Sequence, residues 1–493
     1  MPTRRRPRLL LALGSALALV LLAQPAALAA PVHPAARAAL AAPAPPPLPS
    51  KDPFYTYTGS TPLARVPLGT VVKKRAVTVS VTAAQPSAEQ VLYRTTDQLG
   101  HPSVTVATII KPMNPLLGTK IVAYQTAYDA LGSQCDPSYT LTGGNPSYAL
   151  AQDEEKVMAG YAAAGYTLVV PDYEGTSLHW AAGQESGYGT LDGIRAAENY
   201  LGVSAATPVG MVGYSGGSIA SEWASELAPS YARELHIVGV AEGGIPVDFA
   251  HNLNYVNGSK VWSAVIPAVL VSLSRAFGVN LAPYLSPYGL KVANQVHDQC
   301  ITDFLGHYPG LTVQQLLKPQ YQDFLKIPAF VMIINKLIMG TEPGHPAGPL
   351  LMAVGNADGT GDDVMIAGDV EALAHEYCQQ GVAVVFTQYP GADHTEAAVP
   401  FEVSALAFLT ARFAGTPPVN GCALIGKGNS LAPLPVPVSQ STAGNVSIPA
   451  GANTAAPLAA TGRDEQPLLL IAVLLLGSGA GLLWVSRRTL RRS

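Results

Sequence analysis

The sequence predicts an α/β fold, in which a mostly parallel central sheet is flanked by helices and carries an inserted α-helical cap. Two observations predict it. From about residue 51 to residue 427, short apolar runs alternate with helical patterns, which is typical of parallel strands joined by crossover helices. Between about residues 245 and 348 the alternation stops and helical patterns dominate. A structureless loop of that length would be unusual, so we interpret this segment as the cap.

The individual elements follow from the apolar pattern. Strands are expected at 104–110, 121–124, 166–170, 209–212, 236–240, 349–354 and 382–387. A helix is expected to end near residue 201, and further helices to cover 218–227 and 369–379. In the cap, helical patterns cover 261–277 and 311–337. The second is expected in pieces, because Pro319 and Pro328 interrupt it.

The N-terminus predicts export. Four Arg precede an apolar run over residues 9–22, and Ala27-Leu28-Ala29 is a small-residue cleavage site, so residues 1–29 form an expected signal peptide. A membrane anchor is the alternative, but the run is short for spanning a bilayer. An Ala/Pro-rich leader is expected over residues 30–50.

The C-terminus predicts surface attachment. A disordered spacer is expected over residues 428–457, which are rich in Ser, Pro, Ala, Asn and Gly. Residues 468–485 are apolar and precede four Arg, as in a transmembrane segment with a cytoplasmic tail. Together with Leu-Ala-Ala-Thr-Gly at 458–462, the stretch 458–493 resembles a sortase signal of the LAxTG type. This resemblance implies cleavage between Thr461 and Gly462 and attachment of Thr461 to cell-wall peptidoglycan; a simple membrane anchor is the alternative.

Charge and cysteine content exclude several classes of partner. Without the four Arg before residue 31 and the five after residue 462, 20 of 29 basic residues remain, and without Asp464 and Glu465, 31 of 33 acidic residues remain. The resulting charge of −11 argues against nucleic-acid or anionic-membrane partners. Four cysteines in an exported chain predict two disulfides, with three pairings open. No CxxC spacing occurs, so we expect no zinc site, and no metal or cofactor.

The strongest chemical signal is a G-x-S-x-G motif formed by Gly213, Tyr214, Ser215, Gly216 and Gly217. It lies between an apolar strand and a helix start, which is the context of the nucleophile elbow in the α/β-hydrolase fold. Ser215 is therefore the expected nucleophile. The Gly216 N–H is expected to provide one donor of the oxyanion hole.

A serine nucleophile needs a base and an acid, which follow it along the chain in this fold. His394 lies in a turn after a strand and is the expected base, whereas His375 lies within a helical pattern. Asp358 is the expected acid, because it comes three residues after Gly355 at the end of a strand. Asp362 and Asp363 in the same loop are the alternatives.

Several further motifs resemble the secretory lipase (LIP-type) family over most of residues 51–425. They include 52–55, 91–97 with Gly100, Tyr124-Gln125 to Asp129, 135–139 and 170–175. The acid loop departs from the family pattern G-x-x-D-x-x-V-P, because extra residues follow Asp358.

The resemblance implies an α/β-hydrolase fold with a helical cap that hydrolyses acylglycerols and other carboxylic esters. It implies that Asp129 donates the second oxyanion N–H. It also implies the disulfides Cys135–Cys300 and Cys378–Cys422.

The expected function is therefore a secreted, surface-attached lipase or esterase that acts through an acyl-enzyme, with a lipid or other ester as substrate. One alternative is a serine peptidase on the same fold. The other is a non-catalytic display or adhesion protein, which the intact candidates for all three triad positions disfavour.

Overall fold

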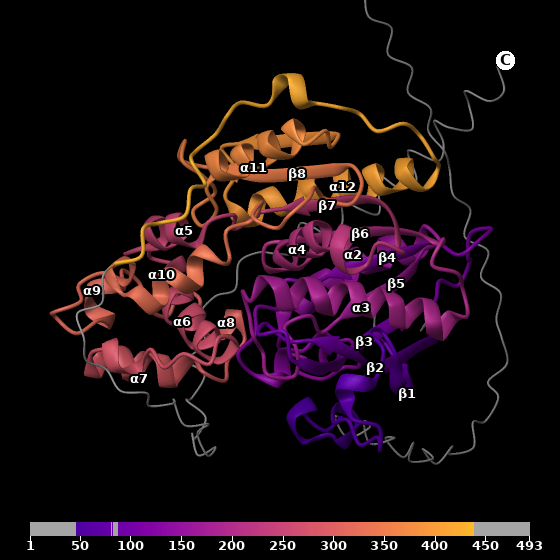
Figure 1. Ribbon diagram of the computed structural model, residues 1–493, viewed down its shortest axis with the longest axis horizontal. Helices are drawn as coiled ribbons and strands as arrows, with labels where there is room; N and C mark the ends of the chain where they lie inside the picture. The colour runs from indigo at the N-terminus through magenta and orange to yellow at the C-terminus, as the bar shows by residue number, and fades with distance from the viewer. Residues whose placement is uncertain (1–45, 80, 82–86, 438–493) are drawn as a thin grey trace, which may run out of the picture. The chain divides into compact units, whose positions relative to one another are not determined.

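The computed structural model describes residues 46–79, 81 and 87–437, which contain a nine-stranded sheet (Figure 1). The strand order is β1-β2-β3-β5-β4-β6-β7-β8-β9. The expected signal peptide, most of the leader and spacer, and the sorting signal lie outside these residues. Within the described part of the chain, no helix is both long and apolar enough to cross a membrane.

Three antiparallel strands form one edge of the sheet. Strands β1 (Val71–Thr78), β2 (Ser87–Thr96) and β3 (Pro102–Ile110) pair in sequence, and β3 pairs antiparallel with β5 (Thr167–Pro171). Strands β1 and β2 were not predicted. The middle of β1 reads Lys-Lys-Arg. Charged residues are common in edge strands, but they interrupt the apolar run by which a strand is recognised in the sequence.

The rest of the sheet is parallel and corresponds to the predicted strands. Besides β5 it contains β4 (Ile121–Gln125), β6 (Pro208–Tyr214), β7 (His236–Gly243), β8 (Leu350–Asn356) and β9 (Val384–Pro390). The loops after parallel strands meet at one edge of a sheet, which is where sites form in open α/β folds.

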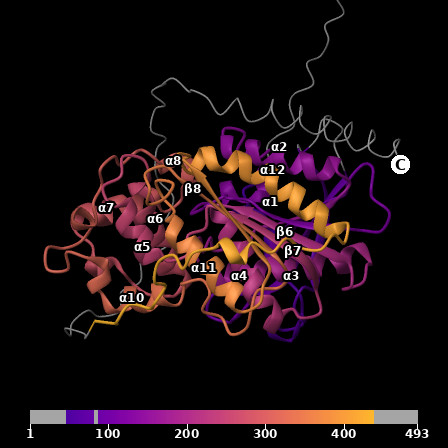
Figure 2. The same cartoon turned by 90° about the horizontal axis from the view of Figure 1, so that it is seen from above.

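Helices cover both faces of the sheet, as Figure 2 shows from above. In β6, Val209 and Met211 join the core that contains α3 (Gly183–Leu201), α4 (Gly216–Tyr231) and α11 (Ala367–Gln379). Val212 and Tyr214 join the core with α2 (Ala149–Ala163) and α12 (His394–Phe413). Because β4, β5, β6 and β8 are buried on both faces, they contain apolar runs, which is why a simple search for such runs found them. The edge strand β9 is only partly buried, and its apolar first half made it visible.

A helical cap lies between β7 and β8, as predicted, and its helices gather to one side of the sheet in Figures 1 and 2. Its α-helices are α5 (Phe249–Val256), α6 (Val265–Ala276), α7 (Pro287–Val296), α8 (Ile301–Phe304), α9 (Val313–Leu316) and α10 (Pro328–Asn335). The piece that begins at Pro328 confirms that proline divides the second helical pattern.

Two disulfides join distant parts of the chain in the implied pairing. Cys135, just before the short helix α1 (Pro137–Thr140), bonds to Cys300 at the start of α8. Cys378 in α11 bonds to Cys422. The first bond ties the segment after β4 to the cap, and the second ties α11 to the end of the domain.

The domain continues beyond the predicted boundary at residue 428. Asn429 donates its side-chain N–H to Asp369 at 2.7 Å, and Leu431 is buried. The Asn335 side chain in α10 exchanges two hydrogen bonds with the Leu434 backbone, at 2.8 and 2.9 Å. The expected spacer over 428–457 is therefore wrong at its start. The composition of this stretch gave no sign that it packs, because polar side-chain and backbone hydrogen bonds hold it.

Candidate active site

Ser215 lies at the tight turn between β6 and α4, as the motif predicts. Its backbone has φ 54°, in the left-handed region, which is the strained conformation of a nucleophile elbow. The Ser215 N–H donates to the Gly243 carbonyl at 2.8 Å, and the Ser218 hydroxyl donates to the Ser215 carbonyl at 2.6 Å. These bonds fix the strained turn, with the Ser215 side chain beyond the carboxyl end of β6.

The glycines of the motif are required by close packing. A Cβ at Gly213 would lie 2.2 Å from the Gly217 carbonyl oxygen. A Cβ at Gly217 would lie 2.1 Å from the Gln125 carbonyl oxygen, and one at Gly216 would lie 1.6 Å from Asp129 Oδ1. The first turn of α4 thus packs directly against the segment that follows β4.

Replacing Gly217 by alanine is expected to lower the free energy of unfolding by about 3 kcal/mol, because the new methyl group must displace the backbone at Gln125. Turnover should fall as well, since the displaced segment leads to Asp129. Gly160→Ala is the matched control: nothing lies within 4 Å of a Cβ there, and alanine should stabilise that exposed helix position by about 1 kcal/mol. Urea unfolding followed by circular dichroism measures both, and equal stabilities would contradict the packing argument.

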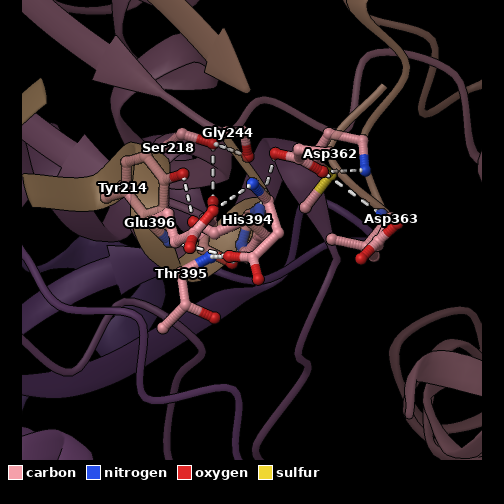
Figure 3. A network of polar contacts seen from close by, with 12 residues as sticks. Tyr214, Ser218, Gly244, Asp362, Asp363, His394, Thr395 and Glu396 are labelled. Carbon is pink, nitrogen blue, oxygen red and sulfur yellow. Dashed lines mark hydrogen bonds and ion pairs between the residues drawn. The ribbon is translucent and has the colours of Figure 1, made fainter. Parts of the chain in front are cut away.

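His394 is the first residue of α12, and its ring joins two side chains. Its Nε2 lies 2.7 Å from Ser215 Oγ, and its Nδ1 lies 2.8 Å from Asp362 Oδ2. A carboxylate can only accept, so Nδ1–H donates to Asp362 and Nε2 is left to accept the Ser215 proton. Asp393 caps the helix reciprocally with Glu396, which fixes where α12 begins. Figure 3 shows His394 beside Asp362.

The carboxylate at His394 is Asp362, so the expectation of Asp358 is corrected. Asp362 is fully buried, and its Oδ1 accepts hydrogen bonds from the Val364 and Met365 N–H groups at 3.2 and 2.6 Å. Asp358 is exposed and accepts from the backbone of its own turn, at residues 360 and 361. The extra residues after Asp358 form that turn, and the chain then presents Asp362 to His394.

Asp129 lies after β4, against the elbow, with φ 41°. It lines the same cavity as Ser215 and Gly216. No described residue accepts a hydrogen bond from the Asp129 N–H. The Gly216 N–H is at the start of α4, where helical N–H groups have no partner within the helix. This arrangement suits the two oxyanion donors that the sequence analysis expected.

Burial raises the pKa of the Asp129 carboxyl to about 7, against an opposing effect of His394. The carboxyl is therefore neutral below pH 7 and becomes charged above it. Beside Gly216, that charge would oppose an oxyanion, so kcat/KM on a soluble ester is expected to fall as the pH rises through about 7. Asp129→Asn cannot ionise and should lack this decline in a profile from pH 5.5 to 9. An unchanged alkaline limb in the variant would assign the decline to another group.

An apolar cavity opens beside Ser215. The cap supplies most of its wall, with Phe249, Leu253, Val256, Trp262, Val265 and Val269. The Trp262 ring also contacts His394 edge-on, with ring centroids 5.2 Å apart. The sequence analysis did not single out Trp262. Across residues 46–79, 81 and 87–437, no group of three or more His, Cys, Asp and Glu side chains could hold a metal ion.

Comparison with known families and proteins shows which family the chain resembles. The family model described as secretory lipase matches residues 146–421. A Mycobacterium tuberculosis protein named as a probable inactive lipase is 33% identical over 382 residues, covering 75% of this chain and 83% of the relative. Lipase A of Moesziomyces aphidis is 30% identical over 391 residues, covering 76% and 82% respectively.

Solved structures give the same picture. Candida antarctica lipase A in its closed state superposes with a TM-score of 0.70 at 28% identity, covering 80% of this chain and 91% of that one. A rice cell wall degrading esterase from Xanthomonas oryzae superposes with a TM-score of 0.56 at 16% identity, covering 71% and 100%. The second similarity concerns the fold alone, which is that of an α/β-hydrolase.

Proposed function

This chain belongs to the secretory lipase family and is a carboxylic ester hydrolase, and from that premise we propose that it is a serine lipase acting through an acyl-enzyme. The observation that carries the proposal is the hydrogen-bonded series Ser215–His394–Asp362 beside an apolar cavity. The same series distinguishes the proposal from a non-catalytic display role.

The chemical steps follow from these contacts. His394 Nε2 takes the hydroxyl proton while Ser215 Oγ attacks the ester carbonyl carbon. The Gly216 and Asp129 N–H groups stabilise the oxyanion of the tetrahedral intermediate. Asp362 holds the His394 ring and stabilises its charged form. His394 then protonates the leaving alcohol, and a water molecule activated by His394 releases the acyl group.

The cavity supports an apolar acyl group as the part of the substrate that the enzyme binds. Its lining is almost entirely aliphatic and aromatic, and burying each methylene of an acyl chain there contributes about 0.8 kcal/mol. A peptide would present polar backbone groups to the same wall, with few partners for them. We therefore propose acylglycerols or similar long-chain esters rather than peptides.

We also propose that the enzyme is held at the cell surface. The support is the order of spacer, Leu-Ala-Ala-Thr-Gly, apolar segment and Arg tail at the C-terminus. Sortase would cleave between Thr461 and Gly462 and join Thr461 to peptidoglycan. Mass spectrometry of wall fragments should find a peptide that ends at Thr461 with a peptidoglycan adduct. An intact C-terminus in the membrane fraction would instead indicate a membrane anchor.

The first experiment is a rate profile with the secreted chain, residues 31–462. The substrates are p-nitrophenyl esters from acetate to palmitate, a triacylglycerol emulsion and a peptide anilide. Turnover of long-chain esters and of the emulsion is the expected result. Turnover of short esters only would make the protein an esterase with the same site. Cleavage of the anilide alone would overturn the proposal in favour of a peptidase, and no turnover at all would favour the display role.

A further inference from the structure

The short turn over residues 126–130 carries Asp129, and side chains from elsewhere in the chain hold the peptide groups on both sides of it. The Tyr148 hydroxyl donates to the Tyr128 carbonyl oxygen at 2.9 Å. The Glu174 carboxyl oxygens accept from the Ala130 N–H, at 3.1 Å for Oε2 and 3.4 Å for Oε1. Neither Tyr148 nor Glu174 was given a role by the sequence analysis.

The first of these bonds acts on the peptide unit that contains the proposed oxyanion donor. The Tyr128 C=O and the Asp129 N–H belong to one planar trans peptide, so they point in opposite directions. Fixing the carbonyl on Tyr148 therefore fixes the direction of the N–H. The bond from Ala130 to Glu174 fixes the next peptide unit, so both units that flank the Asp129 Cα are held.

The two holding side chains are buried, and further hydrogen bonds join the turn to the segment after β5. Tyr148 is 2% exposed and Glu174 is fully buried. The Glu174 N–H donates to the Tyr128 hydroxyl at 2.6 Å, and the Tyr173 hydroxyl donates to the Thr126 carbonyl at 2.6 Å. The turn is thus anchored to the segment after β5 at several points, away from the solvent.

Holding is needed because the turn is strained. A non-glycine residue with φ 41° is in a sparsely populated region and persists only when its surroundings impose that conformation. Without the flanking bonds the backbone at Asp129 would relax, and the N–H would change direction. An oxyanion donor is effective only when it is aligned before the charge develops.

We propose that Tyr148 and Glu174 are positioning residues for the oxyanion hole, which hold the two peptide units around Asp129 so that its N–H stays free and aligned. This inference rests on the proposed function, in which the Asp129 N–H is an oxyanion donor. It assigns to two buried side chains an effect on the transition state rather than on substrate binding.

The protonation of Glu174 decides which variant conserves its role. Burial, and secondarily the neighbouring Asp129 carboxyl, raise the pKa of Glu174 well above its usual value. A neutral side chain with an accepting oxygen in the same place is therefore a close match. Glu174→Gln keeps that oxygen, whereas Glu174→Leu removes it at similar volume.

The central test compares Tyr148→Phe with Tyr93→Phe. Tyr93 is equally buried, and its hydroxyl also donates to a backbone carbonyl, that of Gly189 at 2.6 Å, away from the turn. Both variants lose one buried hydrogen bond of the same kind. Tyr148→Phe is expected to lower kcat roughly 10- to 100-fold with KM changed less than about threefold, whereas Tyr93→Phe should keep kcat within about twofold.

Two further readouts separate alignment from folding. Phenylboronic acid forms a tetrahedral adduct on an active serine, so its Ki should rise in Tyr148→Phe but not in Tyr93→Phe. The final extent of fluorophosphonate labelling measures the fraction of protein with a folded active site. This fraction should be the same in both variants. Glu174→Leu should behave as Tyr148→Phe does, and Glu174→Gln should restore kcat to within about threefold of the original.

Equal kcat and equal boronate affinity in Tyr148→Phe and Tyr93→Phe would overturn the inference. So would a change in KM alone, because it would indicate substrate binding instead of transition-state alignment. Failure of the proposed function would be visible separately, in Ser215→Ala. If that variant were active, Ser215 would not be the nucleophile, and the oxyanion hole proposed beside it would have no role in turnover.

Discussion

Ser215→Ala is expected to lower kcat/KM on p-nitrophenyl esters by at least about 10⁴-fold, because it removes the hydroxyl whose proton His394 Nε2 is placed to accept. The oxyanion donors and the cavity remain, so some turnover above the rate in water is expected. The unfolding temperature should stay close to that of the original protein. Steady-state kinetics and labelling with a fluorophosphonate measure the loss.

Ser404→Ala is the matched control for that experiment. The Ser404 hydroxyl donates to the Pro400 carbonyl at 2.8 Å within α12, on the same helix as His394 but outside the site. Its removal should leave kcat/KM within about twofold. Retained activity in Ser215→Ala, with labelling at another residue, would mean that the nucleophile lies elsewhere.

Asp362→Asn is expected to lower kcat about 10⁴-fold, the size of effect known when the triad acid of a serine protease becomes an amide. The amide can donate to Nδ1, which favours the tautomer with the proton on Nε2, and that nitrogen can then no longer accept the Ser215 proton. KM should change little, because Asp362 does not line the cavity. A pH–rate profile of kcat on a soluble ester measures the effect.

Asp358→Asn is the comparison that the structure offers. The Asn side-chain oxygen can still accept from residues 360 and 361, so the turn should persist and kcat should stay within about twofold. A large loss of kcat in Asp358→Asn with a small loss in Asp362→Asn would restore Asp358 as the triad acid, as the spacing from Gly355 predicted. Equal losses of kcat in the two variants would show that neither carboxylate acts alone as the triad acid and that activity depends on the conformation of the whole loop.

The acid shows why part of the site could not be predicted. Spacing from Gly355 selects Asp358 when the loop has a fixed length, but here a turn closed by Asp358 itself lengthens it. Ser215 was predictable because it follows β6 directly, and His394 because the other histidine after the acid loop, His375, lies within a helix. In the acid loop the choice depends on which carboxylate is buried, and burial is a property of the folded chain.

The same distinction holds for the fold. The inner parallel strands, such as β4 and β8, are buried on both faces and are visible as apolar runs, whereas the charged edge strand β1 is not. Tyr148 and Glu174 were not predictable as partners of the turn at Asp129, since they lie 20 and 44 residues from their acceptor and donor. The motif at 170–175 includes Glu174, but it gives no information about the hydrogen bond between Glu174 and the Ala130 N–H.

The bond between Cys135 and Cys300 restricts how the cap can move. Beside it, the Leu131 N–H donates to the Gln299 carbonyl at 3.0 Å, and Arg275 in α6 donates to the Leu131 carbonyl at 3.1 Å. This end of the cap is therefore fixed to a residue that lies only two positions from Asp129. Elsewhere the cap is held by noncovalent contacts, such as the hydrogen bonds of Ser272 with Trp180 and of Asn335 with Leu434, and these can break and re-form without a covalent change. A shift of the cap at the Cys300 end would therefore also pull on the turn that carries Asp129.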